Sequence, residues 1–187
     1  MKKIILASAS PRRRELLTLA GVSFGVECAD ADETLPQGIS PRDAVELLAL
    51  KKAAAVASSH SDCAVIGADT VVCAQGKILG KPADYDEAFE MLSLLSGKTH
   101  SVYTGVCIIC GGERVVFSEK TDVTFYDLTD SEIDGYIKTN ECFDKAGSYG
   151  IQGRGCTLVK KIDGDYFNVV GLPVARTIRE LKKIIKA

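Results

Sequence analysis

The stretch KIILASASPRRR, residues 3–14, sets the class of the fold. Residues 3–7 form a short and mostly apolar run, which is typical of a buried strand. Ser10 and Pro11 follow, and they are residue types preferred at the N-cap and at the first position of a helix. We therefore predict that the strand leads directly into a helix over residues 11–20, which is how an α/β protein begins.

The predicted helix opens with the consecutive arginines Arg12, Arg13 and Arg14. Positive charges in the first turn oppose the helix dipole, at a cost of roughly a few tenths of a kcal/mol each. A bound anion reverses this effect, because backbone N–H groups, the dipole and the guanidinium groups then all attract it. The turn is a candidate phosphate site, and the alternative is an ordinary strand-to-helix connection.

Helical and extended patterns alternate along the rest of the chain, without repeats, low-complexity segments or long linkers. Further strands are predicted over residues 22–28, 63–72, 100–110, 114–125, 157–162 and 166–170, and further helices over residues 41–58, 84–96, 129–138 and from 173 onward. Gly111-Gly112 is a good two-residue hairpin turn, so the sheet cannot be purely parallel. We expect a single α/β domain over residues 1–187.

The composition is that of an ordinary globular protein, with 46% hydrophobic and 26% charged residues among 187. The 23 basic and 25 acidic residues give a net charge of −2, which argues against nucleic acid as a partner. No apolar run approaches the roughly 20 residues of a membrane span, and the apolar run at the N-terminus is too short for a signal peptide. We expect a cytoplasmic protein that does not interact with membranes.

Seven cysteines are present, and Cys107 and Cys110 form a C-x-x-C pattern. Both fall in a predicted strand, where an offset of three residues points the side chains to opposite faces. No second C-x-x-C and no nearby histidine completes a zinc site. We interpret the cysteines as small buried side chains in a reducing compartment, with a metal or disulfide role as the alternative.

Asp69 interrupts the apolar run of residues 66–72, where an unpaired carboxylate is costly to bury. It is a candidate for binding a metal or for accepting a proton from water. The alternative is an exposed strand end, or a local hydrogen bond to Thr70.

Two glycine-containing segments offer further candidates. GKILGKP, residues 76–82, is one residue too short for a Walker A loop and has Pro82 where Ser or Thr is required, but Lys81 could bind phosphate as a point charge. In DKAGSYGIQGRG, residues 144–155, the glycines let the backbone approach a ligand closely. Gln152 has the donor and acceptor that match uracil or thymine, and its amide could also turn to pair with cytosine. The alternatives are a solvated lysine and a flexible loop.

The combination of these segments closely resembles the Maf family, in order and spacing, over nearly the whole chain. The resemblance rests on ILASASPRR (5–13), GADTV (67–71), GKP (80–82), LSGKTHSVYT (95–104), DKAGSYGIQG (144–153) and VVGLP (169–173). It implies an inosine-triphosphatase-like α/β fold, with a long mixed sheet flanked by helices and two lobes around a central cleft. It also implies a house-cleaning pyrophosphatase that converts a nucleoside triphosphate to the monophosphate and pyrophosphate.

The resemblance also assigns roles to residues. Asp69 corresponds to the proton acceptor of the family, and Glu33 to one of the polar residues that line its cleft. In the mechanism that we expect, Glu33 and Asp69 hold a Mg²⁺ or Mn²⁺ ion. The substrate-binding positions are Ser8, Arg12, Arg13, Lys52, Thr70, Lys81 and Gln152, among which Arg12, Thr70 and Gln152 match the branch that prefers dTTP and UTP. Without the resemblance, Lys52 would be interpreted as a solvated surface residue, and Glu33 as part of a solvated acidic loop or as an oxygen ligand of a metal such as Mg²⁺ or Mn²⁺.

The family also suggests a homodimer. Two alternatives to the function as a dTTP and UTP pyrophosphatase remain. One is a nucleotide-binding regulator of septum formation that needs no hydrolysis, and the other is the same enzyme class with another base preference.

Overall fold

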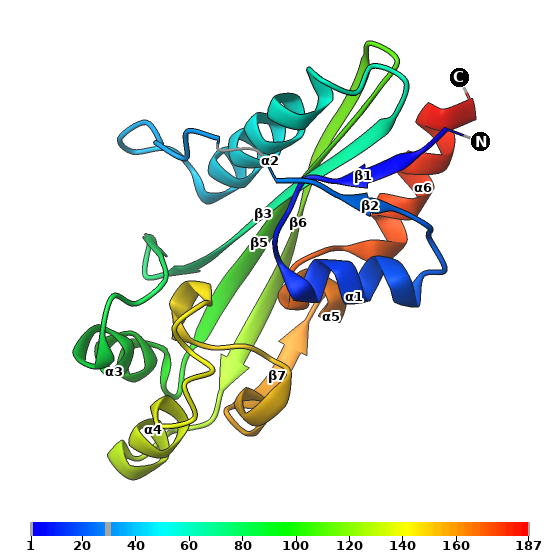
Figure 1. Ribbon diagram of the computed structural model, residues 1–187. Helices are drawn as coiled ribbons and strands as arrows, with labels where there is room; N and C mark the ends of the chain where they lie inside the picture. The colour runs from blue at the N-terminus through cyan, green and yellow to red at the C-terminus, as the bar shows by residue number, and fades with distance from the viewer. Residues whose placement is uncertain (1, 29–30, 187) are drawn as a thin grey trace. The chain divides into compact units, whose positions relative to one another are not determined.

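The computed structural model describes residues 2–28 and 31–186 (Figure 1). Its strands are β1 (Ile4–Leu6), β2 (Gly25–Val26), β3 (Ala64–Ala74), β4 (Lys77–Leu79), β5 (Thr99–Cys110), β6 (Glu113–Phe125) and β7 (Val159–Asp163). Its α-helices are α1 (Pro11–Leu19), α2 (Pro41–Ala57), α3 (Tyr85–Leu95), α4 (Asp130–Ile137), α5 (Tyr166–Val170) and α6 (Val174–Lys186), and two 3₁₀ turns are η1 (Ala146–Ser148) and η2 (Gly153–Thr157). None of the helices in these two ranges is both long and apolar enough to cross a lipid bilayer.

The strands form one mixed sheet in the order β2-β1-β3-β5-β6-β7, with β4 paired to β3. β1 is parallel to both β2 and β3, whereas β4 is antiparallel to β3 and β7 is antiparallel to β6. The predicted α/β class, with a mixed sheet flanked by helices, is therefore confirmed.

The chain divides into two compact units, as the expectation of two lobes requires. The first unit consists of Met1–Asp69, Thr104–Glu119 and Gly171–Ala187, and the second of Thr70–Tyr103 and Lys120–Val170. The central cleft and the single domain over residues 1–187 stay predictions.

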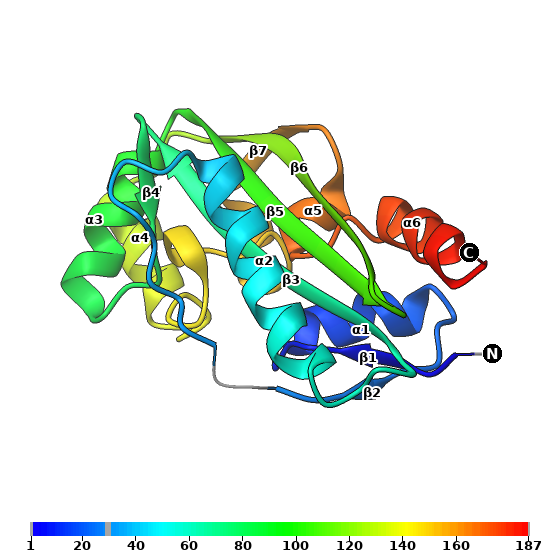
Figure 2. The ribbon, with the colours of Figure 1, turned by 90° about the horizontal axis from the view of Figure 1, so that it is seen from above.

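In the first unit, α2 lies directly on β3 and β5 (Figure 2). A Cβ atom added to Gly67 would be 2.4 Å from the carbonyl oxygen of Ala49, and one added to Gly105 would be 2.3 Å from that of Val45. Only glycine fits at these two positions, so the backbone of α2 can approach both strands closely. The core between these elements is made of small and branched side chains: Ile5, Ala7, Ala49, Ala53, Val56, Cys63, Val65 and Cys107.

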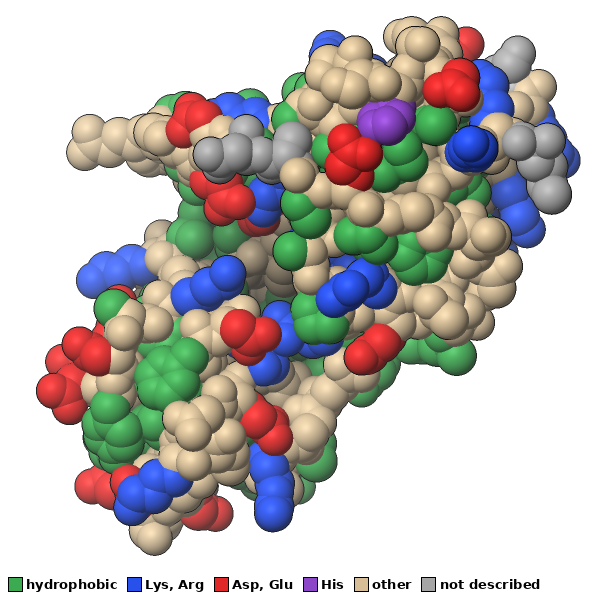
Figure 3. Space-filling view, in the orientation of Figure 1, with side chains coloured by type: hydrophobic (Ala, Val, Ile, Leu, Met, Phe, Trp, Pro, Cys, Tyr) green, Lys and Arg blue, Asp and Glu red, His purple; other side chains and the backbone are tan. Residues whose placement is uncertain are grey.

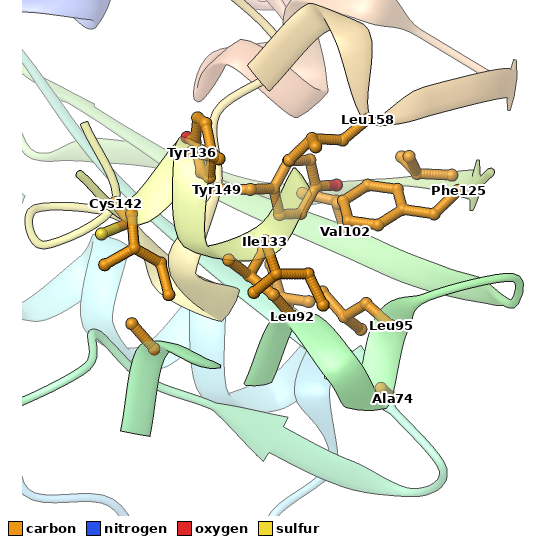
Figure 4. Close-up of a cluster of buried hydrophobic side chains, with 14 residues drawn as sticks. Ala74, Leu92, Leu95, Val102, Phe125, Ile133, Tyr136, Cys142, Tyr149 and Leu158 are labelled. Carbon is orange, nitrogen blue, oxygen red and sulfur yellow. The ribbon is translucent and has the colours of Figure 1, made fainter. Parts of the chain in front are cut away.

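The second unit has its own hydrophobic core, in which α3 and α4 pack against the sheet (Figure 4). Leu92 of α3 and Ile133 of α4 are buried together with Phe125 of β6. The ring of Tyr149 meets that of Phe125 edge to face at 4.7 Å between centroids, and His100 packs edge to face against both. These aromatic contacts tie the glycine-rich segment to the core of this unit.

The prediction of a strand over residues 166–170 is wrong, because this segment is the helix α5. The carboxylate of Asp165 accepts a hydrogen bond from the N–H of Phe167 at 2.8 Å, as at a helix start. The buried amide of Asn168 donates to the carbonyl of Val102 and to the hydroxyl of Thr121. These long-range bonds decide the conformation, and the five-residue pattern does not reveal them.

Two strand predictions differ from the structure in extent. The strand predicted over residues 22–28 is reduced to Gly25–Val26, and both residues are exposed at the edge of the sheet. The sequence did not predict β4, which pairs with β3 after a turn in which Gln75 and Gly76 both have positive φ.

All seven cysteines are free thiols. The interpretation as buried side chains is right for Cys63, Cys107, Cys110 and Cys142 and wrong for Cys28 and Cys156, which are exposed. Burial raises the pKa of the Cys107 thiol to about 12, so it remains protonated near neutral pH.

Candidate functional site

The connection between β1 and α1 positions Ser8 and Arg13. The hydroxyl oxygen of Ser8 accepts hydrogen bonds from Nη1 of Arg13 at 3.0 Å and from the N–H of Ser10 at 3.3 Å. Nε of Arg13 donates to the carbonyl of Gly171 at 2.9 Å. The Arg13 guanidinium is thus fixed by two partners that are distant in sequence from each other, and the residue as a whole is 9% exposed.

The start of α1 is positively charged and is not neutralised within its own first turn. Ser10 is the N-cap, as predicted, but its side chain makes no capping hydrogen bond, and the first turn contains no acidic residue. Arg12 is partly exposed and Arg14 is exposed. This arrangement suits an anionic ligand, because the dipole and the arginines act in the same direction.

Lys52 of α2 joins the two candidate carboxylates. Its Nζ is 2.6 Å from Oδ1 of Asp69 and 3.0 Å from Oε1 of Glu33. The side chains of Lys52 and Asp69 are 18% and 13% exposed, whereas that of Glu33 is 62% exposed. Asp69 lies two residues after Gly67 on β3, on the same face, so the close approach of α2 to Gly67 also brings Lys52 to Asp69.

A second lysine, Lys51, holds the loop that carries Glu33. Its Nζ donates to Oδ2 of Asp32 at 3.2 Å and to the carbonyl of Thr34 at 3.1 Å. Asp32 also accepts the N–H of Thr34 at 2.9 Å. Hydrogen bonds from Thr34, with a smaller contribution from Lys51, lower the pKa of Asp32 to about 2. Glu33 therefore lies in the middle of a hydrogen-bonded turn from Asp32 to Thr34. Asp30, two residues before this turn, is outside the described residues.

The arginines and the carboxylates of the first unit interact electrostatically. Burial lowers the pKa of Arg13, the positive charge of Arg12 lowers it further, and the negative charges of Asp69 and Glu33 raise it. These interactions indicate that the start of α1 lies near the Lys52 cluster, as a shared charged site would need. The structure thus brings Ser8, Arg12, Arg13, Glu33, Lys52 and Asp69 into the same unit, as an active site made of them requires.

The donor set of this site suits a divalent ion that is shared with a substrate. Protein-bound Mg²⁺ is commonly held by one or two carboxylates, with water and substrate phosphates as its other ligands. Asp69 and Glu33 meet at the same ammonium group and could supply those carboxylates. Across residues 2–28 and 31–186, no group of three or more His, Cys, Asp or Glu side chains could form a complete cage.

The remaining candidates, Thr70, Lys81 and Gln152, lie in the second unit. Thr70 is partly exposed on β3, whereas the side chains of Lys81 and Gln152 are exposed. The segments that carry these last two residues are joined by a hydrogen bond of 2.9 Å from the N–H of Gly147 to the carbonyl of Gly80.

Glu141 fixes the turn that follows Gln152. Its carboxylate accepts the N–H of Arg154 with both oxygens, at 3.0 and 3.3 Å. Sequence reasoning missed Glu141, because no pattern in its neighbourhood marks it. It also missed the carbonyl of Gly171, although this residue lies in the VVGLP segment that supports the family resemblance.

An open hollow of about 450 Å³ lies elsewhere, over α3. It is lined by Tyr85, Asp86, Phe89 and Glu90, and Figure 3 shows hydrophobic and acidic side chains next to each other in this region. Its two carboxylates would repel a triphosphate, so we do not assign the nucleotide to it.

Comparison with known proteins agrees with the sequence resemblance. The family model described as "Maf-like protein" matches residues 3–184. A "dTTP/UTP pyrophosphatase" of Bacillus cereus (strain ATCC 14579) is 58% identical over 183 residues, which cover 98% of this chain and 96% of that protein. One from Bacillus thuringiensis subsp. konkukian is 57% identical with the same coverage.

Among solved structures, that of the Staphylococcus aureus Ham1 protein is similar over a region that covers 67% of this chain and 73% of the Ham1 chain, with 15% sequence identity and a TM-score of 0.49.

Proposed function

We propose that this chain, which belongs to the Maf-like protein family, hydrolyses dTTP and UTP to the nucleoside monophosphate and pyrophosphate. Two relatives with this activity in their names are 57 and 58% identical to it over 98% of its length. The observation that carries the proposal is the contact of 2.6 Å between Lys52 and Asp69, in a site that also couples Asp69 to the buried Arg13.

In the mechanism that we propose for this hydrolysis, Asp69 orients a water molecule and accepts its proton as the water oxygen attacks the α-phosphorus. The bond between the α-phosphorus and the oxygen that bridges to the β-phosphorus breaks, and pyrophosphate leaves. Ser8, Arg12, Arg13 and Lys52 hold the phosphate oxygens and stabilise the charge that develops on them. Phosphoryl chemistry depends mainly on such positioning and charge stabilisation.

Glu33 and Asp69 are the residues that would hold a Mg²⁺ or Mn²⁺ ion, which when bound would neutralise phosphate charge. Lys81 is proposed as a further phosphate ligand, and Thr70 and Gln152 as residues that select the base. Gln152 could also pair with cytosine, so the preference for dTTP and UTP over CTP is part of the proposal. We further propose that the protein acts in the cytoplasm, where reduced thiols persist, and that it forms a homodimer.

The test is an assay of pyrophosphate release with dTTP, UTP, CTP and GTP, in the presence of Mg²⁺ and again with a chelator. We expect release from dTTP and UTP that the chelator abolishes. Binding of nucleotide without release would instead support the regulatory alternative. Release from CTP or GTP alone would mean that the enzyme class is right and the base preference is wrong.

A variant links this activity to the site. Asp69→Asn is nearly isosteric and retains an oxygen that can accept from Lys52, so we expect it to fold. Its turnover should fall roughly a hundred- to ten-thousandfold, which is the usual contribution of a general base. Asp86→Asn, on the exposed surface of α3, is the matched control. Near wild-type turnover in Asp69→Asn would contradict the assignment of the base.

A further inference from the structure

The ammonium group of Lys52 lies between the two carboxylates that we assign to the metal. Both contacts, 2.6 Å to Asp69 and 3.0 Å to Glu33, are within hydrogen-bonding distance of one nitrogen atom. A cation therefore lies in direct contact with both carboxylates.

The carboxylates at this position already have positively charged partners. Asp69 and Glu33 contribute two negative charges, and Lys52 contributes one positive charge in direct contact. Arg13, which is buried and interacts electrostatically with both carboxylates, contributes another. A divalent ion that approached alone would gain little attraction from carboxylates that are already paired with cations, and it would be repelled by the ammonium. It would also have to lose water ligands, which Mg²⁺ does reluctantly.

A triphosphate changes this balance, because it brings several negative charges to the same site. The lysine side chain is a flexible stem with a point charge and three donors, so Lys52 can exchange carboxylate partners for phosphate oxygens. The two carboxylates then become available as ligands at the moment when the negative charge of the site increases.

We propose that Lys52 is an internal counter-cation that keeps the Asp69 and Glu33 pair closed to free divalent ions, so that metal and nucleotide bind together. This inference rests on the proposed function, from which it takes Asp69 and Glu33 as metal ligands. It assigns to Lys52 a role in the unliganded protein, in addition to phosphate binding in the complex.

The experiment measures binding of Mn²⁺ by the loss of its free electron paramagnetic resonance signal. Wild-type protein alone should bind Mn²⁺ weakly. The analogue α,β-methylene-dTTP resists cleavage at the α–β linkage and binds some Mn²⁺ itself, which is subtracted. After this correction, the affinity of the protein for Mn²⁺ should be about tenfold or more higher with the analogue than without it. Lys52→Met without nucleotide should bind Mn²⁺ about tenfold or more tightly than wild type, since both carboxylates lose their counter-cation.

Two variants separate charge from packing. Lys52→Arg keeps a cation and should bind Mn²⁺ alone as weakly as wild type. Lys182→Met removes an exposed lysine of α6, which has no part in the site, and should leave Mn²⁺ binding unchanged. Circular dichroism checks that each variant is folded, and if Lys52→Met is not, the wild-type comparison with and without the analogue decides.

Tight binding of Mn²⁺ by wild-type protein alone, equal to that with the analogue, overturns the proposal. Equal binding by wild type and Lys52→Met does so as well. Pyrophosphate release is measured on the same wild-type preparation. If the protein releases pyrophosphate and also binds Mn²⁺ tightly on its own, the role of Lys52 is refuted and the proposed function is not.

Discussion

Gly67 of β3 and Ala49 of α2 approach so closely that a Cβ atom on the glycine would be 2.4 Å from the alanine carbonyl oxygen. The same Cβ would be 2.6 Å from the backbone nitrogen of Ala53. Since Lys52 precedes Ala53 and Asp69 follows Gly67 by two residues, this approach of two backbones determines the distance between the lysine and the carboxylate.

Gly67→Ala should therefore displace α2 from β3 and separate Lys52 from Asp69. We expect a loss of about 1–3 kcal/mol in the free energy of unfolding, typical of overpacking, together with reduced pyrophosphate release. Gly135→Ala is the matched control, because Gly135 is exposed within α4 and has open space around its Cα. This change should stabilise the protein by about 0.5–1 kcal/mol. Urea unfolding of both variants measures the effects, and equal stabilities would contradict the packing argument.

Arg13→Lys should impair the site even though the positive charge is retained. A lysine cannot bond to both the Ser8 hydroxyl and the Gly171 carbonyl in the geometry of the guanidinium fork. One hydrogen bond to a charged group contributes about 1.5–3 kcal/mol. If the transition state loses this stabilisation, kcat/KM should fall roughly ten- to a hundredfold. Arg14→Lys, at an exposed position of the same turn, should have no such effect. Steady-state kinetics with dTTP measures both, and similar losses in the two variants would contradict the importance of the buried contacts.

His100 should make the protein less stable in mild acid. Burial lowers its pKa from 6.5 to about 4, so between these values the unfolded chain binds a proton that the folded protein does not. The free energy of unfolding should thus be unaffected by this group above pH 6.5 and should decrease by about 3 kcal/mol as the pH falls to about 4. His100→Gln, which can still bond to the Tyr149 hydroxyl, should show a smaller decrease over this range. Urea unfolding between pH 7.5 and pH 4 compares them, and identical pH profiles would assign the acid sensitivity to other groups.

Glu141 should influence nucleotide binding through the turn that follows Gln152. Glu141→Ala removes the acceptor of the Arg154 N–H and should raise KM for dTTP and UTP by about tenfold, with little change in kcat. Glu141→Gln retains one acceptor oxygen and should have a smaller effect. Glu113→Ala, at the exposed start of β6, serves as the control. If kcat fell while KM stayed constant, Glu141 would act on the chemical step rather than on the turn.

The sequence predicted most of the elements, because capping residues and turns mark their ends locally. The hydroxyl of Ser40 accepts from the N–H of Asp43 at the start of α2, and Thr129 and Glu132 form the capping box of α4. At Gly111-Gly112, both residues have positive φ, as the predicted hairpin turn requires. Such signals are contained within a few residues and can be recognised without knowledge of the fold.

Features that depend on distant partners could not be predicted in this way. The helix α5 depends on bonds from Asn168 to Val102 and Thr121, and its five residues have no helical period to detect. In the site, Asp69 and the arginines were recognisable from local sequence, since each is unusual in its own element. Glu33 and Lys52 were not, because their partners lie far along the chain, and only the family resemblance indicated them.

The hydrogen bond from Gly147 to the Gly80 carbonyl has a consequence for how this enzyme can change its substrate preference. An insertion or deletion around residue 147 would also displace Lys81, and so would disturb the phosphate contact proposed for Lys81 together with the base contact proposed for Gln152. A relative that prefers another base should therefore keep the length of this segment constant. We expect its adaptation to be confined to exchanged side chains such as that of Gln152.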